Sequence, residues 1–151
     1  MAIMHPKKFN LVGHRTGVKA ERLLYEAIRD HLPNDYQCFH SFKIPHQYDR
    51  SGQIREADFL ITHKDAGVLV LEVKADRIYF DSDRSKLMQI RQDENFRTYG
   101  NPKVLNLEDQ IQDTNRSLRS YLRENLSKYP FVSNIVAFPH SSKLDARLPD
   151  H

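Results

Sequence analysis

The sequence predicts an α/β domain in which helices flank a central mixed sheet. The elements are expected in the order helix, strand, hairpin, polar excursion, helix, strand. This order rests on two segments with helical apolar stripes and on several apolar runs of strand length. With 151 residues and 39% hydrophobic content, the chain suits one compact domain with one core.

The first predicted helix spans residues 17–31. Thr16 can cap its N-terminus, and Pro33 lies just beyond its end. At about 100° per residue, four apolar side chains share one stripe and charged residues occupy the opposite side. The apolar residues are Leu24, Tyr25, Ile28 and Leu32. We expect this amphipathic helix to pack on another element.

The next elements are predicted strands. Residues 36–44 are rich in aromatic and branched side chains, which favours a first strand. The polar residues 46–53 are typical of a loop. Two apolar runs, 57–63 and 68–75, flank a short glycine-containing turn and predict an antiparallel hairpin. Both runs are apolar at most positions, which indicates burial on both faces.

The second half of the chain begins with a polar excursion over residues 76–103. It has one short strand expected near residues 78–80, and its length indicates a functional loop or structure that the pattern does not reveal. A second helix is predicted over 107–126, between Pro102 and Pro130. Its apolar residues are Leu107, Ile111, Leu118, Tyr121 and Leu122. The apolar run 135–138 predicts a last, central strand.

These elements divide the chain into three parts. We expect an N-terminal extension at 1–15, the folded domain at 16–139, and a tail or the start of a linker at 140–151.

Composition excludes several classes of protein. The single cysteine, Cys38, rules out an internal disulfide and a Cys-rich zinc site, and it is most simply a small buried hydrophobe. No apolar stretch approaches the roughly 20 residues that cross a membrane, and the N-terminus lacks a secretory signal. We therefore expect a cytoplasmic protein without a membrane partner. The net charge of +3 permits a nucleic-acid partner without requiring one.

Glu21 is the first candidate for chemistry. It falls within the apolar stripe of the first helix, where a buried carboxylate is costly unless it is paired or bound to a metal. Two interpretations stay open for this residue alone: a structural ion pair with an arginine of a neighbouring element, or a metal ligand.

The hairpin supplies three further candidates. Glu72 and Lys74 lie two residues apart in an apolar run and therefore share a face. If the hairpin turns near residues 65–66, Asp58 pairs with about 72 to 74, and the three side chains converge. Two carboxylates this close repel each other unless a cation lies between them. The alternative is an exposed Glu–Lys pair with an unrelated aspartate, which the apolar neighbours disfavour.

Oxygen ligands without a His or Cys cluster suit Mg²⁺ or Mn²⁺ rather than zinc. Such an ion can polarise a phosphate and activate a water molecule, and a nearby lysine can stabilise the phosphate's developing charge. This is the chemistry of phosphodiester hydrolysis.

These residues resemble the nuclease-related domain family (NERD) of the PD-(D/E)XK nuclease superfamily. The resemblance covers about residues 16–138 and is carried by Glu21 on the first helix, Glu56-Ala57-Asp58 and Glu72-Val73-Lys74. It implies an α-β-β-β-α-β, restriction-endonuclease-like core. Ala57 replaces the proline of the superfamily's name.

The resemblance also implies residue roles. Asp58 and Glu72 would bind the metal, Lys74 would be the catalytic lysine, and Glu21 would complete or support the metal site. Family members often carry Asn-Pro followed closely by a glutamine on the second helix. Asn101-Pro102 matches this pattern, and the nearest glutamine, Gln110, stands several residues further on than usual and is taken as a further site member. Glu56 could assist, but a structural role is the simpler interpretation.

The leading functional hypothesis is a Mg²⁺- or Mn²⁺-dependent DNA endonuclease or nickase. One alternative is a nucleic-acid-binding or protein-interaction module that uses a nuclease-like fold without turnover. The other is a module of a larger DNA-processing protein, with a helicase or another module in the same chain or a partner chain. All four core residues are present, which argues against a degenerate site.

Overall fold

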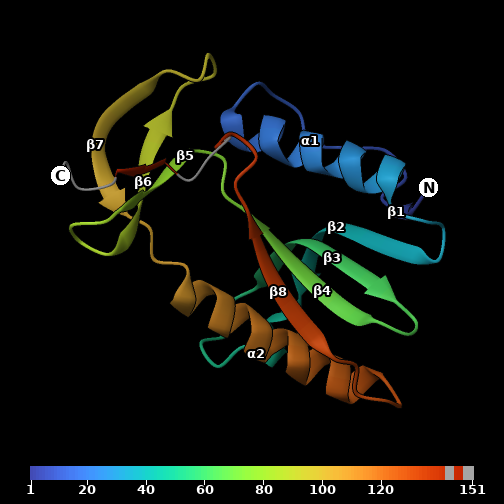
Figure 1. Ribbon diagram of the computed structural model, residues 1–151. Coiled ribbons are helices and arrows are strands. Elements are labelled where there is room, and N and C mark those ends of the chain that lie inside the picture. Colours follow the sequence, from blue (N-terminus) through green and yellow to red (C-terminus); the bar gives the residue numbers. More distant parts are fainter. Residues whose placement is uncertain (142–144, 148–151) are drawn as a thin grey trace. The chain divides into compact units, whose positions relative to one another are not determined.

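A computed structural model describes residues 1–141 and 145–147. It contains two helices, a five-stranded mixed sheet and a second, smaller sheet (Figure 1), which confirms the predicted α/β class. The chain divides into two compact units. The first comprises Met1–Asn10, Tyr25–Glu72 and Leu107–Val136; the second comprises Leu11–Leu24, Val73–Asn106 and the described part of Ala137–His151.

The predicted helices and strands are present with small shifts at their ends. Helix α1 spans Thr16–His31 and helix α2 spans Glu108–Asn125. The strands of the larger sheet are β1 (Ile3–His5), β2 (Tyr36–Ile44), β3 (Arg55–His63), β4 (Gly67–Val73) and β8 (Val132–Ala137). With the segment between β4 and α2 set aside, the order from α1 onward is α-β-β-β-α-β.

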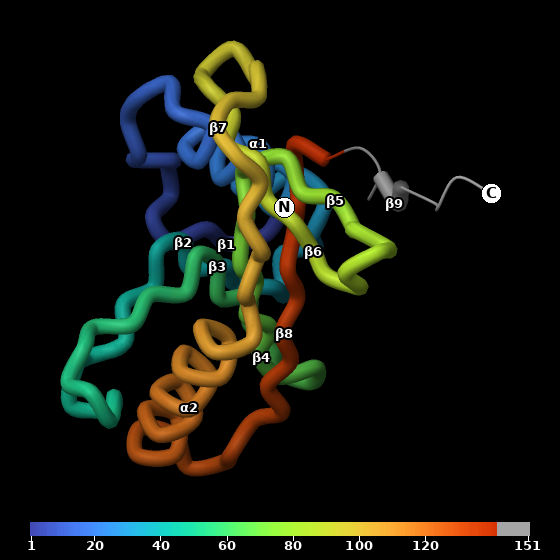
Figure 2. Tube along the Cα trace, turned by 90° about the vertical axis from the view of Figure 1, so that its left-hand side faces the viewer, coloured from blue at the N-terminus to red at the C-terminus, as the bar shows by residue number. Residues whose placement is uncertain are grey.

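The larger sheet has the strand order β1-β2-β3-β4-β8. Strand β1 pairs parallel with β2, whereas β2 with β3 and β3 with β4 pair antiparallel. The hairpin strands β3 and β4 are interior, and Phe59, Leu60 and Ile61 are buried in succession, as predicted. The prediction of a central last strand is wrong. Strand β8 follows β4 at the end of the order (Figure 2), and its Ile135 is 51% exposed.

The two faces of this sheet bury different sets of side chains. On one face, Leu60 and Val70 belong to a cluster with Leu118 and Leu122 of α2. On the other face, the buried His40 packs between Phe59, at 4.8 Å between ring centroids, and Tyr25 of α1, at 5.9 Å. The sheet is therefore covered by the C-terminal half of α1 on one side and by α2 on the other.

The strand alternation is interrupted in β2 and β3. Phe39 and Phe42 are three residues apart, yet both pack on the α2 cluster, and Ser41 between them has a positive φ of 54°. On β3, Ala57 and Leu60 are also three residues apart within that cluster. A regular period of two does not hold through this region. Shared orientation of Glu56 and Asp58 therefore does not follow from alternation, and Glu56 is exposed.

The polar loop predicted at 46–53 includes a short 3₁₀ helix, η1 (His46–Tyr48), and is anchored by Asp49. The Asp49 side chain is only 6% exposed. Its carboxylate accepts hydrogen bonds from the Ser51 hydroxyl, from Arg55 Nε at 2.9 Å and from Ser117 Oγ of α2 at 3.1 Å. The hydrogen bonds from Ser51 and Arg55 hold the pKa of Asp49 well below its usual range. One buried charge thus ties this loop to the start of β3 and to α2.

The predicted excursion forms a second sheet in the second unit. Strands β5 (Arg77–Asp81), β6 (Lys86–Gln92) and β7 (Thr98–Val104) are an antiparallel meander, and β9 (Asp145–Arg147) pairs parallel with β5. The strand expected near residues 78–80 is β5. Strand β7 could not be predicted from an apolar pattern, since every one of its positions is exposed.

Both chain ends contribute strands. The N-terminal extension supplies β1, which pairs with β2 from Ile3 to His5. The expected tail or linker at 140–151 falls partly outside the described residues, at 142–144 and 148–151. Within the described chain, neither helix is long and apolar enough to cross a membrane.

Candidate active site

Asp58 and Glu72 lie on the neighbouring interior strands β3 and β4. Phe59 pairs with Leu71, and Leu60 with Val70. The paired register runs from His63 with Gly67 to Phe59 with Leu71 and ends one residue short of Asp58, so the pairing of Asp58 with about 72 to 74 stays a prediction. Residues that pair directly across two antiparallel strands have Cβ atoms about 5 Å apart. Glu72 is buried, at 8% exposure, and Asp58 is half-buried.

Gln110 is joined to Glu72. Its Nε2 donates a hydrogen bond to Oε1 of Glu72 at 2.7 Å. Gln110 lies in the first turn of α2, which packs on the same sheet through Leu118 and Leu122. An amide that donates to one carboxylate oxygen restricts the orientation of the carboxyl group. Gln110 therefore acts on Glu72 from the second helix, as a positioning residue.

Glu21 and Lys74 belong to the second unit. Glu21 is half-buried on α1, next to the fully buried Ala20, which agrees with its place in the apolar stripe. Lys74 follows the last residue of β4, and its backbone N–H donates to the carbonyl oxygen of Ala137 at 3.0 Å. That bond fixes the backbone at Lys74 next to the end of β8. Of the predicted set, Glu72 and Gln110 are joined by a hydrogen bond within the first unit.

The donors at this point suit a hard divalent cation. Among the described residues, no three His, Cys, Asp or Glu side chains gather into a metal-holding group. Mg²⁺, however, is commonly held by one or two carboxylates, with water and substrate phosphate as its remaining ligands. Asp58 and Glu72, two carboxylates on adjacent strands, are donors of the type that such an ion takes. They offer neither the thiolates nor the imidazoles that zinc prefers.

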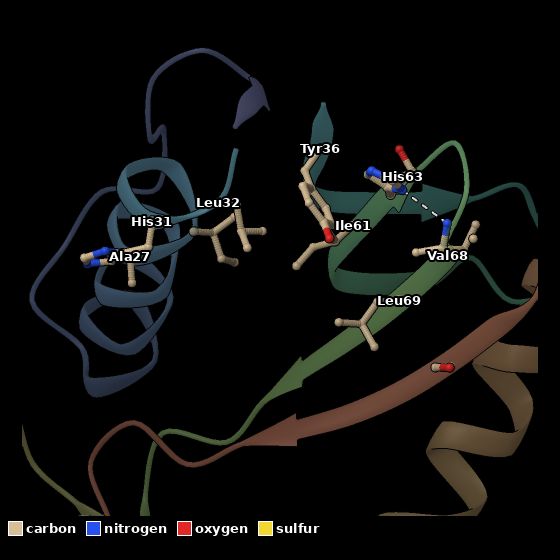
Figure 3. A pocket seen from close by; sticks show the side chains of 13 residues that line it. Ala27, His31, Leu32, Tyr36, Ile61, His63, Val68 and Leu69 are labelled. Atoms are coloured by element: carbon tan, nitrogen blue, oxygen red, sulfur yellow. Dashed lines mark hydrogen bonds between the residues drawn. The ribbon is translucent and has the colours of Figure 1, made fainter. Parts of the chain in front are cut away.

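An apolar pocket of about 510 Å³ lies elsewhere in the first unit (Figure 3). It is bordered by α1, by β3 and by the start of β4, and its lining includes Leu32, Ile61 and Leu69. None of the predicted site residues lines it. Its apolar character gives it no role in holding a metal or a phosphate.

His63, at the edge of this pocket, is a structural histidine. Its Nε2 bonds to Asp35 Oδ2 at 2.7 Å, and its Nδ1 accepts the backbone N–H groups of Asp65 and Ala66, both at 3.1 Å. Because Nδ1 is an acceptor, the proton is on Nε2 and points to Asp35. Both ring nitrogens are engaged, so His63 closes the hairpin turn and is not a free base. The hydrogen bond from His63 lowers the pKa of Asp35.

The family model described as the nuclease-related domain, NERD, matches residues 16–139. That match covers most of the chain. The chain belongs to the NERD family. No curated protein and no solved structure matches it. The NERD match spans α1, the β2–β4 strands, the β5–β7 meander, α2 and β8, so the candidate residues all lie inside the family domain.

One site contact of this NERD domain could not be predicted from the sequence. The pattern indicated Gln110 as a site member but not its partner, because Gln110 and Glu72 are separated by 38 residues. The signal that was available is a polar amide in the first turn of an amphipathic helix, where a side chain can reach the adjoining sheet.

Proposed function

We propose that this NERD domain is a metal-dependent nuclease that hydrolyses phosphodiester bonds of DNA, as an endonuclease or nickase. The observation that carries the proposal is the hydrogen bond at 2.7 Å from Gln110 to the buried Glu72, which lies on the strand next to the one that carries Asp58. Family membership adds that the domain is nuclease-related. Two acidic side chains close together on interior strands would be costly without a cation, and a divalent ion is the natural counter-charge.

In this proposal Asp58 and Glu72 hold Mg²⁺ or Mn²⁺, and Glu21 completes or supports the site from α1. Held by these residues, such an ion would supply Lewis-acid polarisation of the phosphate and would lower the pKa of an attacking water. Lys74 stabilises the negative charge that builds on the phosphate oxygens. Gln110 holds the Glu72 carboxylate in one orientation, so that less of its freedom is lost when the ion binds.

The reaction is a hydrolysis at phosphorus. A water oxygen forms a new bond to phosphorus and the water gives up one proton to solvent, while the bond from phosphorus to one bridging sugar oxygen breaks and that oxygen takes up a proton from solvent. The products are a terminal phosphate and a free hydroxyl. Negative charge increases on the phosphate during this step, which is why a nearby lysine and oxygen-held cation accelerate it.

The test is cleavage of supercoiled plasmid and of end-labelled single strands with Mg²⁺, Mn²⁺ or EDTA. We expect nicking by the wild-type protein with either metal, no nicking in EDTA, and loss of nicking in both Asp58→Ala and Lys74→Ala. Cleavage that survives both substitutions, or none under any metal, contradicts the proposal. DNA binding without cleavage supports the alternative of a non-catalytic module, or a domain that works only beside a helicase or another partner module.

A further inference from the structure

The outer face of α2 carries a row of arginines. Arg116, Arg119 and Arg123 line a surface groove of about 480 Å³ together with three neutral polar residues, Gln112, Asn115 and Ser120. All three arginines are exposed. They lie on the side of the helix away from Leu118 and Leu122, which pack in the core. We call Arg116, Arg119 and Arg123 the α2 arginine row.

The positive charge of this row is little compensated. Arg119 has no ion pair within the described chain, and Arg123 lies over the ring of Tyr129, 5.6 Å from its centroid. Arg116 approaches Asp113 only to 3.6 Å. In contrast, Arg29 and Arg55 hold carboxylates at 2.7 Å and 2.9 Å. The guanidinium groups of the row are therefore less engaged with carboxylates than those of Arg29 and Arg55.

The spacing and chemistry of the row suit a phosphate backbone. Arginines at positions i, i+3 and i+7 span about 10 Å along a helix, which is about three nucleotide steps at roughly 3.4 Å each. Arginine, asparagine, glutamine and serine are among the side chains that contact DNA phosphates and sugars. No carboxylate lines this groove, all of whose residues are described, and no aromatic ring offers a stacking surface for bases in it. These features favour contact with the backbone rather than with base edges.

We infer that the α2 arginine row binds the phosphate backbone of a DNA duplex, independently of sequence and outside the cleavage site. This inference rests on the proposed function, because it assumes a nucleic-acid substrate. Gln110 is six positions before Arg116, which at about 100° per residue places it a third of a turn around α2. The row thus contacts phosphates that flank the bond to be cut, and the same helix orients Glu72.

The test is binding of a fluorescein-labelled duplex, measured by anisotropy between 50 and 300 mM KCl with Ca²⁺ in place of Mg²⁺. The variant is Arg116→Gln/Arg119→Gln/Arg123→Gln, since glutamine removes the charge and keeps helix propensity. The matched control, Lys7→Gln/Lys43→Gln/Lys64→Gln, removes the same charge from exposed positions elsewhere in the first unit. Circular dichroism confirms that both are folded.

We expect the arginine variant to bind about tenfold or more weakly than the control at 100 mM salt, and its log–log salt slope to be shallower by about 2 to 3. A second duplex of unrelated sequence should give the same result. Equal affinity and slope in the two variants overturns the inference, as does tighter wild-type binding to polyglutamate than to DNA. Loss of binding without any wild-type cleavage supports the row and contradicts only the nuclease proposal.

Discussion

Gln110 Nε2 donates a hydrogen bond to Oε1 of the buried Glu72 at 2.7 Å, and so links the first turn of α2 to the interior strand β4. This contact decides how the Glu72 carboxylate is presented to its surroundings. A group that orients a metal ligand changes metal affinity or activity by about 10- to 100-fold when it is removed.

Gln110→Ala should therefore raise the Mg²⁺ concentration needed for half-maximal nicking by about 10- to 100-fold. The measurement is the initial nicking rate as a function of metal concentration. Glu124→Ala, at an exposed position of the same helix, is the matched control and should behave as wild type. A Gln110→Ala protein with an unchanged metal requirement would show that the bond to Glu72 is only structural.

Asp58→Asn and Glu72→Gln should each lower the nicking rate by about a thousandfold, or about 4 kcal/mol of transition-state stabilisation. Because both carboxylates would hold one ion, the double variant should be hardly slower than either single variant. Single-turnover rates of the three proteins measure this. Losses that simply multiply would mean that the two residues act independently.

Asp49 should make the protein sensitive to acid. Its pKa is lowered in the folded state by hydrogen bonds from Ser51 and Arg55, so its contribution to stability is present above the unfolded value of about 3.9 and lost as the pH falls below it. Urea unfolding between pH 3 and 7 should show this loss in the wild type. The pH dependence should be flatter in Asp49→Asn. Asp83→Asn, at an exposed position, should follow the wild type, and an unchanged slope in Asp49→Asn would refute this role.

Gly67 should tolerate no side chain. It has a φ of 92°, and an added Cβ would collide with the carbonyl oxygen of Phe131, which also accepts the backbone N–H of Val68 at 2.8 Å. Gly67→Ala should lower the free energy of unfolding by about 1–3 kcal/mol. Gly52→Ala tests the backbone cost alone, because Gly52 has a φ of 72° and an open environment. Equal effects of the two substitutions in urea unfolding would exclude the collision.

Cys38 should be inert in the folded protein. Its side chain is fully buried, and burial raises the pKa of its thiol to about 12. Since the thiolate is the reactive form, alkylation by iodoacetamide at pH 8 should be far slower in the native protein than in urea. Rapid native alkylation would mean that the core around β2 opens frequently.

The elements with a strong apolar pattern were predictable from the sequence. Helix α1, strand β2 and the β3–β4 hairpin follow from their periodicity, and the hairpin puts Asp58 and Glu72 on adjacent strands. The β5–β7 meander was not predictable in this way, because only Ile78 and Met88 are buried among its residues. The prediction that β8 lies in the centre of the sheet was wrong for a different reason. An apolar run indicates a strand but not its place in the order.

The sequence could indicate which residues form the candidate site, but only partly which of their side chains lie in contact. Local spacing relates Glu72 to Lys74, and the turn relates both to Asp58. The contact of Gln110 depends on how α2 packs on the sheet, through residues such as Leu118, which no spacing rule gives. The interruption of alternation at Ser41 was equally hidden, since serine is common in strands and loops alike.

Iron-directed cleavage of the polypeptide tests most directly whether Asp58 and Glu72 hold one divalent ion. Fe²⁺ in place of Mg²⁺, with ascorbate and oxygen, generates hydroxyl radicals that cut the chain close to the bound metal. We predict fragments that end near residues 58 and 72, that disappear with excess Mg²⁺, and that are absent from Asp58→Asn. Fragments that end elsewhere, or that persist in Asp58→Asn, would contradict a metal site between these two carboxylates.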